Sequence, residues 1–206
     1  MRRSILATVV ALALICLAAT HPRAASAAER PVPTGREVRC LAMIAYAEAA
    51  VDGVEGMSAV IRVVRNRMAD ARFPGDACAV VAQAGQFQPI TESAALRQVA
   101  RDPEGYSIPA VLGASSPGAR RLLATAHRLA RAPRPGPDPT GGALFFVYPV
   151  YMDPARCPWF ATLRRTARIG SHVFMTDRGV AAAEPALDCA EAGSGLDRRG
   201  GDVPGA

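Results

Sequence analysis

Glu48 is a carboxylate placed where an apolar side chain would be expected. It follows Leu41, Ile44 and Ala45 at helical spacing, at the end of the apolar face of a helix predicted over residues 35–50. Apolar neighbours and a helix C-terminus both disfavour negative charge, so the pKa of Glu48 is expected to be raised. A carboxyl group that stays protonated near neutral pH can donate a proton to a leaving oxygen, as glycosidic cleavage requires. Periodicity alone favours the plainer interpretation that Glu48 reaches solvent.

Asp52 lies four residues after Glu48 and is the candidate for a second catalytic carboxylate. Glycosidases that use two carboxyl groups hold them roughly 5–9 Å apart. An Asp beside Gly53 is also typical of a turn. A lytic transglycosylase does not need the second group, because the C6 hydroxyl of the sugar attacks and one Glu acts first as acid and then as base. The spacing leaves these alternatives open.

Side chains that suit contact with a sugar occur in three later segments. Gln86 and Phe87 place an amide beside an aromatic ring, which suits hydrogen bonding and stacking, and Phe87 fits the core equally well. Tyr148 and Trp159 are candidates for a platform under a sugar ring, and each also fits the core or the rim of a site. His172 lies between apolar residues, which favours a buried structural role over catalysis. The candidate substrate-binding residues are Gln86, Phe87, Tyr148 and His172.

No cofactor chemistry is indicated. The sequence contains no HExxH, no GxSxG and no phosphate-binding glycine loop. It has no CxxC pair, and His127 and His172 are the histidines left once the predicted signal segment described below is removed, which excludes a three-histidine metal site. We therefore expect neither a metal ion nor an organic cofactor.

Residues 1–27 have the three parts of a secretory signal peptide. Arg2 and Arg3 precede a 15-residue apolar run, Ile5–Ala19, which is short for a membrane-spanning helix, and Ala25–Ala27 supplies small residues for cleavage. The sequence therefore predicts export to the periplasm or the cell exterior, with no stable membrane insertion after cleavage. An uncleaved N-terminal anchor is the rival interpretation.

The chain without that segment is mildly basic. The formal net charge is +6 for all 206 residues, and removing the three arginines of the predicted signal leaves about +3. Such a charge suits an anionic polymer such as peptidoglycan or nucleic acid. A solvated arginine-bearing surface explains it more simply, and export disfavours nucleic acid.

The cysteines agree with an exported protein. After the signal an even number remains, which in an oxidising compartment suggests two disulfides. These cysteines are Cys40, Cys78, Cys157 and Cys189. Of the three possible connectivities we favour Cys40–Cys78 with Cys157–Cys189, and a cysteine nucleophile is disfavoured because all four can pair.

The elements that must position these residues are predicted to be mainly helical. Thr34 and Glu37 form a capping-box signature at the start of the first helix, and Ser116 with Pro117 suits the start of a later one. Helices are predicted over residues 35–50, 54–69, 77–84, 92–101 and 117–132. Short strands or edge loops are predicted over residues 143–148 and 168–175, with loops over 85–90 and 132–142.

The expected fold class is α+β, mainly helical, as a single domain with a small β element. An aromatic content of 5% disfavours a β-sandwich. The expected organisation is a signal peptide (1–27), an N-terminal lead (28–36), a folded domain (37–178) and a C-terminal tail (179–206) that is disordered toward its end.

Four sequence blocks carry a resemblance to a known family. The blocks are CLAMIAYAEA (40–49), RFP with a following QF (72–87), DPTGGALFF (138–146) and RIGSHVF (168–174). In this order and spacing the chain resembles the SleB-like cell wall hydrolase family, the spore-cortex lytic enzyme type, from about Cys40 to Asp177.

That resemblance implies a lysozyme-like fold and an activity on peptidoglycan glycan strands at the cell wall. The implied reaction is cleavage of the β-1,4 bond between N-acetylmuramic acid and N-acetylglucosamine, with Glu48 as the catalytic acid/base. Among enzymes, the alternative that we keep is a hydrolase in which Asp52 assists an attacking water. No protein partner is implied.

The sequence also departs from the family pattern. The usual Glu-Ala-Arg-Gly-Glu run reads Glu48-Ala-Ala-Val-Asp52, and the residues after Gln86-Phe87 are Gln-Pro-Ile rather than aromatic. These changes retain the acid/base and alter the segment expected to position substrate. A catalytically weakened wall-binding or scaffolding protein is therefore the alternative from another functional class.

Overall fold

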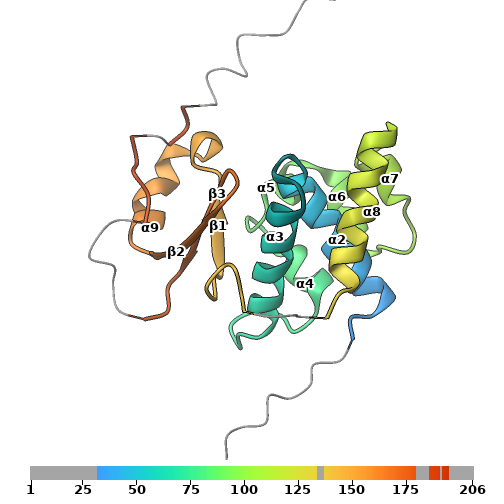
Figure 1. The fold of residues 1–206 in the computed structure, drawn as a ribbon, viewed down its shortest axis with the longest axis horizontal. Coiled ribbons are helices and arrows are strands. Elements are labelled where there is room, and N and C mark those ends of the chain that lie inside the picture. Colours follow the sequence, from blue (N-terminus) through green and yellow to red (C-terminus); the bar gives the residue numbers. More distant parts are fainter. Residues whose placement is uncertain (1–31, 134–136, 180–185, 191, 195–206) are drawn as a thin grey trace, which may run out of the picture. The chain divides into compact units, whose positions relative to one another are not determined.

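The computed structural model describes residues 32–133, 137–179, 186–190 and 192–194. The predicted signal segment (1–27) and most of the predicted tail (179–206) lie outside the described residues. The helices are α2 (Gly35–Ala49), α3 (Gly53–Met68), α4 (Ala77–Val81), α5 (Gln88–Glu92), α6 (Ala94–Arg101), α7 (Ile108–Val111), α8 (Pro117–Arg131) and α9 (Cys157–Ala161) (Figure 1). The strands are β1 (Phe145–Val147), β2 (Arg164–Ile169) and β3 (His172–Thr176), and 3₁₀ turns occur at η1 (Ala50–Asp52), η2 (Pro149–Tyr151) and η3 (Pro154–Arg156). The α+β, mainly helical class with a small β element is confirmed.

Helix α2 is the centre of the helical part, where it contacts α3, α4 and α8 (Figure 1). Its start is fixed by the predicted capping box: Thr34 Oγ1 accepts the Glu37 N–H, and the Thr34 N–H donates to Glu37 Oε2 at 2.9 Å. The helix is buried along most of its length, from Val38 to Ala49. A helix that is apolar nearly all round must be covered on several sides. A polar side chain near its C-terminus, such as Glu48, is therefore held inside the molecule.

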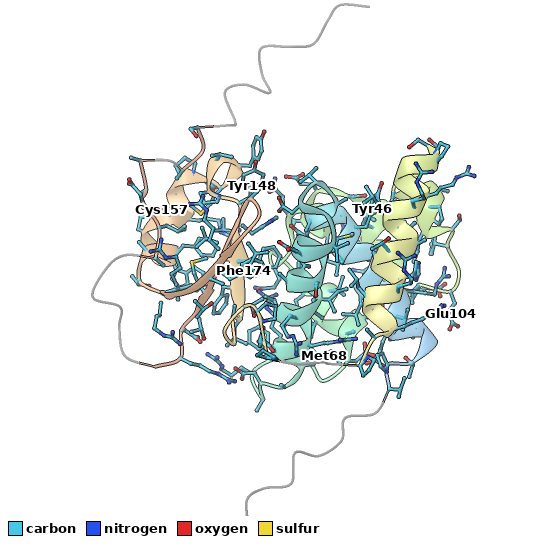
Figure 2. All side chains as sticks on the ribbon, viewed as in Figure 1. Tyr46, Met68, Glu104, Tyr148, Cys157 and Phe174 are labelled. Carbon is cyan, nitrogen blue, oxygen red and sulfur yellow. A yellow bond between two sulfur atoms is a disulfide. The ribbon has the colours of Figure 1, made fainter. Side chains whose placement is uncertain are left out.

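The sheet is antiparallel, in the order β1-β3-β2. Every residue of its central strand β3 is buried, because that strand is covered on both faces. Phe174 packs with Ala59 and Val63 of α3, and Figure 2 labels it at this junction. Val173 and Met175 belong to a second, smaller core with α9. Strand β3 thereby joins the helical part to the segment that contains α9.

The loops hold more helix than the sequence predicts. The predicted loop over residues 85–90 is wrong at its end, because α5 begins within it with a proline in its first turn. The helix predicted over residues 92–101 begins two residues later, where Ser93 Oγ caps α6. Helices α7 and α9 are not predicted from the sequence, because each spans about one turn and is too short to show a hydrophobic period.

The segment predicted over residues 168–175 is a hairpin rather than one strand. It contains the end of β2, a turn at Gly170 and Ser171, and most of β3. Gly170 has a φ of +56°, which a residue with a side chain rarely adopts. The start of β2 carries exposed arginines in place of an apolar alternation, so the sequence pattern does not show it.

Both favoured disulfides are present. Cys40–Cys78 joins α2 to α4, and Cys157–Cys189 joins α9 to the segment after β3. Ala186 and Leu187 are buried in the second core beside α9. The packed part of the chain therefore extends beyond residue 178, where the sequence places the start of a tail.

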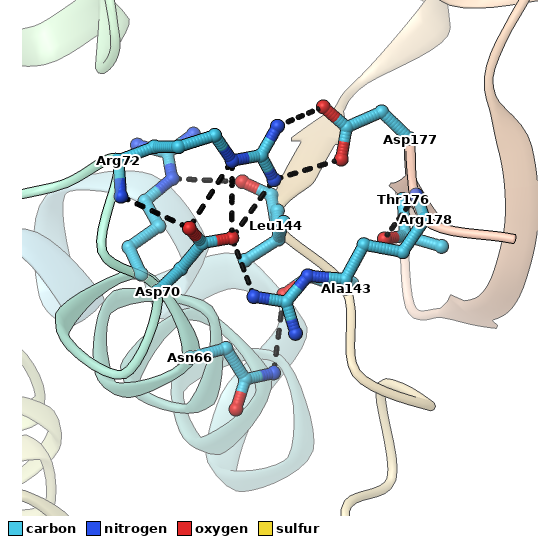
Figure 3. A network of polar contacts seen from close by, with 9 residues as sticks. Asn66, Asp70, Arg72, Ala143, Leu144, Thr176, Asp177 and Arg178 are labelled. Atoms are coloured by element: carbon cyan, nitrogen blue, oxygen red, sulfur yellow. Dashed lines mark hydrogen bonds and ion pairs between the residues drawn. The ribbon is translucent and has the colours of Figure 1, made fainter.

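Two polar networks fasten the sheet to the end of α3. The carboxylate of Asp70 binds Arg72 at 2.8 Å, and Arg72 in turn binds Asp177 at 2.6 Å, just after β3 (Figure 3). Asp138 accepts hydrogen bonds from Thr140 N–H at 2.8 Å and from Asn66 Nδ2 at 2.8 Å. The Asp-Pro-Thr-Gly-Gly segment is thus a turn that leads into β1, and its polar atoms bind each other and α3.

Candidate active site

A cavity of about 560 Å³ lies between the end of α2 and the sheet with its following turns. This volume is within the usual range of small-molecule sites. From the helical part it is lined by Glu48, Arg67, Gly85, Gln86, Gln88, Thr91 and Glu92. From the sheet and α9 it is lined by residues 145–148 and 151–153 with Arg156, Trp159, Phe160 and His172.

Glu48 faces this cavity from the last turn of α2. Its Oε1 is buried and has no hydrogen-bond partner among the described residues. Burial raises the pKa of Glu48 to about 8, against the opposing effects of the Arg67 guanidinium and of a backbone hydrogen bond from Gln88, while Glu92 raises it further. Burial thus acts on the pKa of Glu48 in the direction expected from its apolar neighbours, and its catalytic role stays a prediction.

Arg67 is a site residue that the sequence analysis does not single out. Its side chain is buried, and its Nε donates to the Leu144 carbonyl at 2.7 Å. The guanidinium carbon lies 5.1 Å from the centre of the Phe87 ring and 5.3 Å from that of Phe73. Burial lowers the pKa of Arg67 to about 10, and Glu48 opposes this effect. The sequence signal that could have identified it is its position seven residues after Val60, on the apolar face of α3.

Asp52 is not among the described residues that line the cavity. Its Oδ1 accepts hydrogen bonds from the Ser171 N–H at 3.0 Å and from Ser171 Oγ at 2.8 Å. Its Oδ2 lies 2.8 Å from Nδ1 of His172. Burial acts to raise the pKa of Asp52, but the hydrogen bonds from Ser171 and His172 outweigh it, so that pKa lies below its usual value. The two predicted carboxylates thus lie in different surroundings, Glu48 in the cavity lining and Asp52 against the Ser171–His172 segment.

His172 binds Asp52 and also lines the cavity that Glu48 faces. Burial lowers the pKa of His172 more than the Asp52 carboxylate raises it. Its ring centre lies 5.3 Å from that of Phe146 and 5.7 Å from that of Tyr148. The imidazole is therefore held among aromatic rings, in surroundings that favour its neutral form.

The other predicted contact residues divide into two groups. Gln86 and Tyr148 line the cavity, as does Trp159, which is 48% exposed. Phe87 is 1% exposed and is not among the described lining residues, because its ring packs in the core against Arg67 and Phe146. The core interpretation of Phe87, left open by the sequence, is the one its burial supports.

Within the described ranges, no group of three or more His, Cys, Asp or Glu side chains is placed to hold a metal ion. None of the helices described is both long and apolar enough to span a bilayer.

Comparison with known proteins places this chain in a family. A sequence model described as Cell Wall Hydrolase matches residues 51–175, and the chain belongs to this family. The match includes Asp52, Arg67 and His172, and it begins three residues after Glu48.

The chain is similar to spore cortex-lytic enzymes of two bacteria. It is 27% identical over 146 residues to that of Oceanobacillus iheyensis, covering 69% of this chain and 44% of the relative. It is 28% identical over 142 residues to that of Bacillus subtilis, covering 68% of this chain and 38% of the relative. The chain therefore spans less than half the length of these relatives.

A solved structure is also similar, that of the catalytic domain of the germination-specific lytic transglycosylase SleB from Bacillus anthracis. The TM-score is 0.46 at 24% identity, and the match covers 69% of this chain and 96% of that domain.

Proposed function

We propose that this chain is a peptidoglycan glycosidase that cleaves the β-1,4 bond between N-acetylmuramic acid and N-acetylglucosamine. The observation that carries the proposal is Glu48, which faces a cavity lined by aromatic side chains and whose buried Oε1 has no hydrogen-bond partner among the described residues. This burial raises the pKa of Glu48 to about 8. Membership of the Cell Wall Hydrolase family supports the cell wall as the target. Peptidoglycan strands are the proposed partner, and the predicted signal segment supports action in the periplasm or outside the cell.

The proposed reaction uses Glu48 twice. Protonated Glu48 donates its proton to the glycosidic oxygen as the bond from that oxygen to C1 breaks. The C6 hydroxyl of the same sugar then attacks C1, and the Glu48 carboxylate takes the proton released. The products are a 1,6-anhydro end, a new free hydroxyl on the leaving sugar, and Glu48 protonated for the next cycle. Between the two steps the nearby Arg67 guanidinium stabilises the Glu48 anion.

The hydrogen bonds that the other carboxylates already make favour a lytic transglycosylase over a two-carboxylate hydrolase. Asp52 lies outside the cavity lining and accepts hydrogen bonds from Ser171 and His172. In the lining, Glu92 Oε1 accepts from the Gln88 amide at 2.6 Å, and Asp153 Oδ1 accepts from the Ala155 N–H at 2.9 Å. Both lining carboxylates thus already have local hydrogen-bond donors.

Gln86, Tyr148 and Trp159 are the proposed sugar contacts. Trp159 lines the cavity and is 48% exposed, although Phe145 and Phe160 both meet its ring edge-to-face, which leaves aromatic surface for contact with a sugar ring. Phe87 acts one step removed, because its ring supports Arg67 from the core.

The test is digestion of purified peptidoglycan with the mature protein and with its Glu48→Gln variant, followed by mass spectrometry of the new sugar ends. Glu92→Gln is the matched control, because it neutralises another carboxylate of the same cavity. We expect 1,6-anhydro ends from the mature protein and from Glu92→Gln, and none from Glu48→Gln.

Other products would change the proposal in defined ways. Reducing N-acetylmuramic acid ends would indicate hydrolysis by water, and their loss in Glu92→Gln would identify the second carboxylate. Glycan binding without cleavage by the mature protein would contradict an enzyme and favour the wall-binding alternative.

A further inference from the structure

The hydrogen bonds around Asp52 leave one nitrogen of His172 for the cavity. Asp52 Oδ1 takes two bonds from Ser171, and Oδ2 takes the bond from His172 Nδ1. The side chains are 7% and 3% exposed, so this pairing is screened from water. A carboxylate accepts only, so Nδ1 carries the hydrogen. In a neutral imidazole the other nitrogen, Nε2, then has a free lone pair.

Two glycines make room for this pair. A side chain at Gly170 would place its Cβ 2.5 Å from Cγ of Asp52. A side chain at Gly56, in the first turn of α3, would place its Cβ 2.3 Å from Cβ of Asp52. Real atoms do not approach so closely, so both positions require glycine if Asp52 is to reach the hairpin. The Asp52–His172 contact therefore depends on glycine at both of these backbone positions.

The proposed substrate offers hydrogen-bond donors that suit the lone pair of Nε2. His172 shares the cavity with Glu48, and Phe146 and Tyr148 flank its ring, which fixes its plane. Amino sugars present hydrogen-bond donors, namely hydroxyl groups and acetamido N–H groups. The other cavity-lining groups include Arg67 and Gln88, which supply donors of their own to a bound sugar.

We propose that His172 binds the glycan by accepting a hydrogen bond at Nε2 from a sugar hydroxyl or acetamido N–H, and that Asp52 is a positioning residue that fixes this tautomer. The inference rests on the proposed function for the identity of the ligand. It assigns Asp52 a role different from that of a second catalytic carboxylate.

The variant Asp52→Asn tests the positioning role directly. The Ser171 N–H can only donate, so the amide oxygen of Asn must face Ser171 and its NH₂ group must face His172. Nδ1 then has to accept, and the hydrogen moves to Nε2, as happens when the triad aspartate of a serine protease is replaced by asparagine. Ser171→Ala is the matched control, because it removes one bond to Asp52 and leaves the bond to His172.

The tautomer is measured by ¹⁵N NMR of the imidazole nitrogens near neutral pH. We expect the Nδ1–H form in the unmodified protein and in Ser171→Ala, and the Nε2–H form in Asp52→Asn, with all three folded by circular dichroism. An unmodified protein with its hydrogen on Nε2, or an Asp52→Asn protein with no change of tautomer, would contradict the positioning role. A purely structural bond between Asp52 and His172 predicts the same exchange, so the ligand contact of Nε2 needs a separate measurement of binding.

Ligand binding is measured in the Glu48→Gln background, which prevents turnover. The probe is the β-1,4 tetramer of N-acetylglucosamine, with cellotetraose as the second arm because it carries hydroxyl groups in place of the acetamido groups. His172→Asn keeps a donor toward Asp52 and removes the Nε2 acceptor. We expect it to weaken binding of the acetylated tetramer roughly tenfold, the usual effect of losing one hydrogen bond in a partly buried site.

The outcomes separate the inference from the proposed function. A loss confined to the acetylated tetramer assigns the donor to an acetamido N–H, and a loss on both glycans assigns it to a hydroxyl group. Unchanged affinity of folded His172→Asn overturns the role of His172 alone. Failure of every variant to bind either glycan, together with no cleavage of peptidoglycan by the mature protein, overturns the proposed function as well.

Discussion

Two carboxylates four residues apart show opposite electrostatic behaviour. Glu48 and Asp52 are both largely withdrawn from solvent, yet the pKa of Glu48 is raised to about 8 and that of Asp52 is lowered. The difference is the supply of hydrogen-bond donors, since Asp52 accepts three from the hairpin turn while Glu48 Oε1 has no partner among the described residues. Burial therefore sets the pKa of Glu48, whereas bonded donors set that of Asp52.

Among the substitutions that test this comparison, the one at Glu48 should have the largest effect, and that effect is on catalysis. Glu48→Gln should lower glycan cleavage by roughly 10²- to 10⁴-fold, because it removes the proton donor and acceptor. Its stability should be unchanged or higher at neutral pH, because a neutral amide replaces a group whose charged form is disfavoured there. Cleavage assays and thermal unfolding measure the two properties, and Glu48→Gln cleaving at the wild-type rate would refute the role.

The pH dependence of stability should expose the same group. The folded state keeps the Glu48 proton to about pH 8, whereas the unfolded chain releases it near the ordinary glutamate pKa of 4.5. Between these values the native state binds more protons, so stability falls as pH rises, by at most about 1.4 kcal/mol per pH unit for this group. Denaturant titrations from pH 4 to 9 should show this slope in the unmodified protein and a shallower one in Glu48→Gln. Equal slopes would contradict a raised pKa.

Asp52 should respond in the opposite sense. Asp52→Asn should lower stability at neutral pH by about 2 kcal/mol, because it weakens the bonds from Ser171 and His172 to a charged acceptor. Since the folded pKa is lowered, the stabilisation is present above the unfolded value of 3.8 and is lost as pH falls through the folded value. The two proteins should thus converge in stability in acid, as measured by urea unfolding. A constant difference at all pH values would count against a charged Asp52.

The smallest expected effect concerns Arg67. Arg67→Gln removes the cation that favours charged Glu48, so the loss of cleavage at high pH should move to higher pH by up to about one unit. Arg67→Lys retains a positive charge and is the control. Rate measurements across pH 6 to 10 check this, and a shift toward lower pH in Arg67→Gln would contradict the proposed interaction.

The sequence predicts much of the helical part and less of the sheet. Helices α2, α3 and α8 show a full hydrophobic period or a recognisable cap, and their predicted bounds agree with the structure to within one residue. Helices α7 and α9 lack the length for a period, and β2 is a strand with exposed arginines. Such elements are set by what packs against them rather than by their own sequence.

The candidate site divides in the same way. Position along α2 is enough to single out Glu48, because the helix period alone places it at the end of an apolar face. The partners of Asp52 are 119 and 120 residues away along the chain, and no local pattern relates them. The sequence accordingly allows Asp52 to be a second catalytic carboxylate, whereas the fold surrounds it with donors.

The sequence by itself determined the helical class and the unusual setting of Glu48, because both depend on local periodicity or composition. It left three disulfide connectivities open, and the structure contains the one that we favoured. The tertiary structure decided which groups meet: Arg67 beside Glu48, Phe87 beneath Arg67, and Asp52 against His172. These contacts join residues from different elements, and they depend on the geometry of surfaces that only folding brings together.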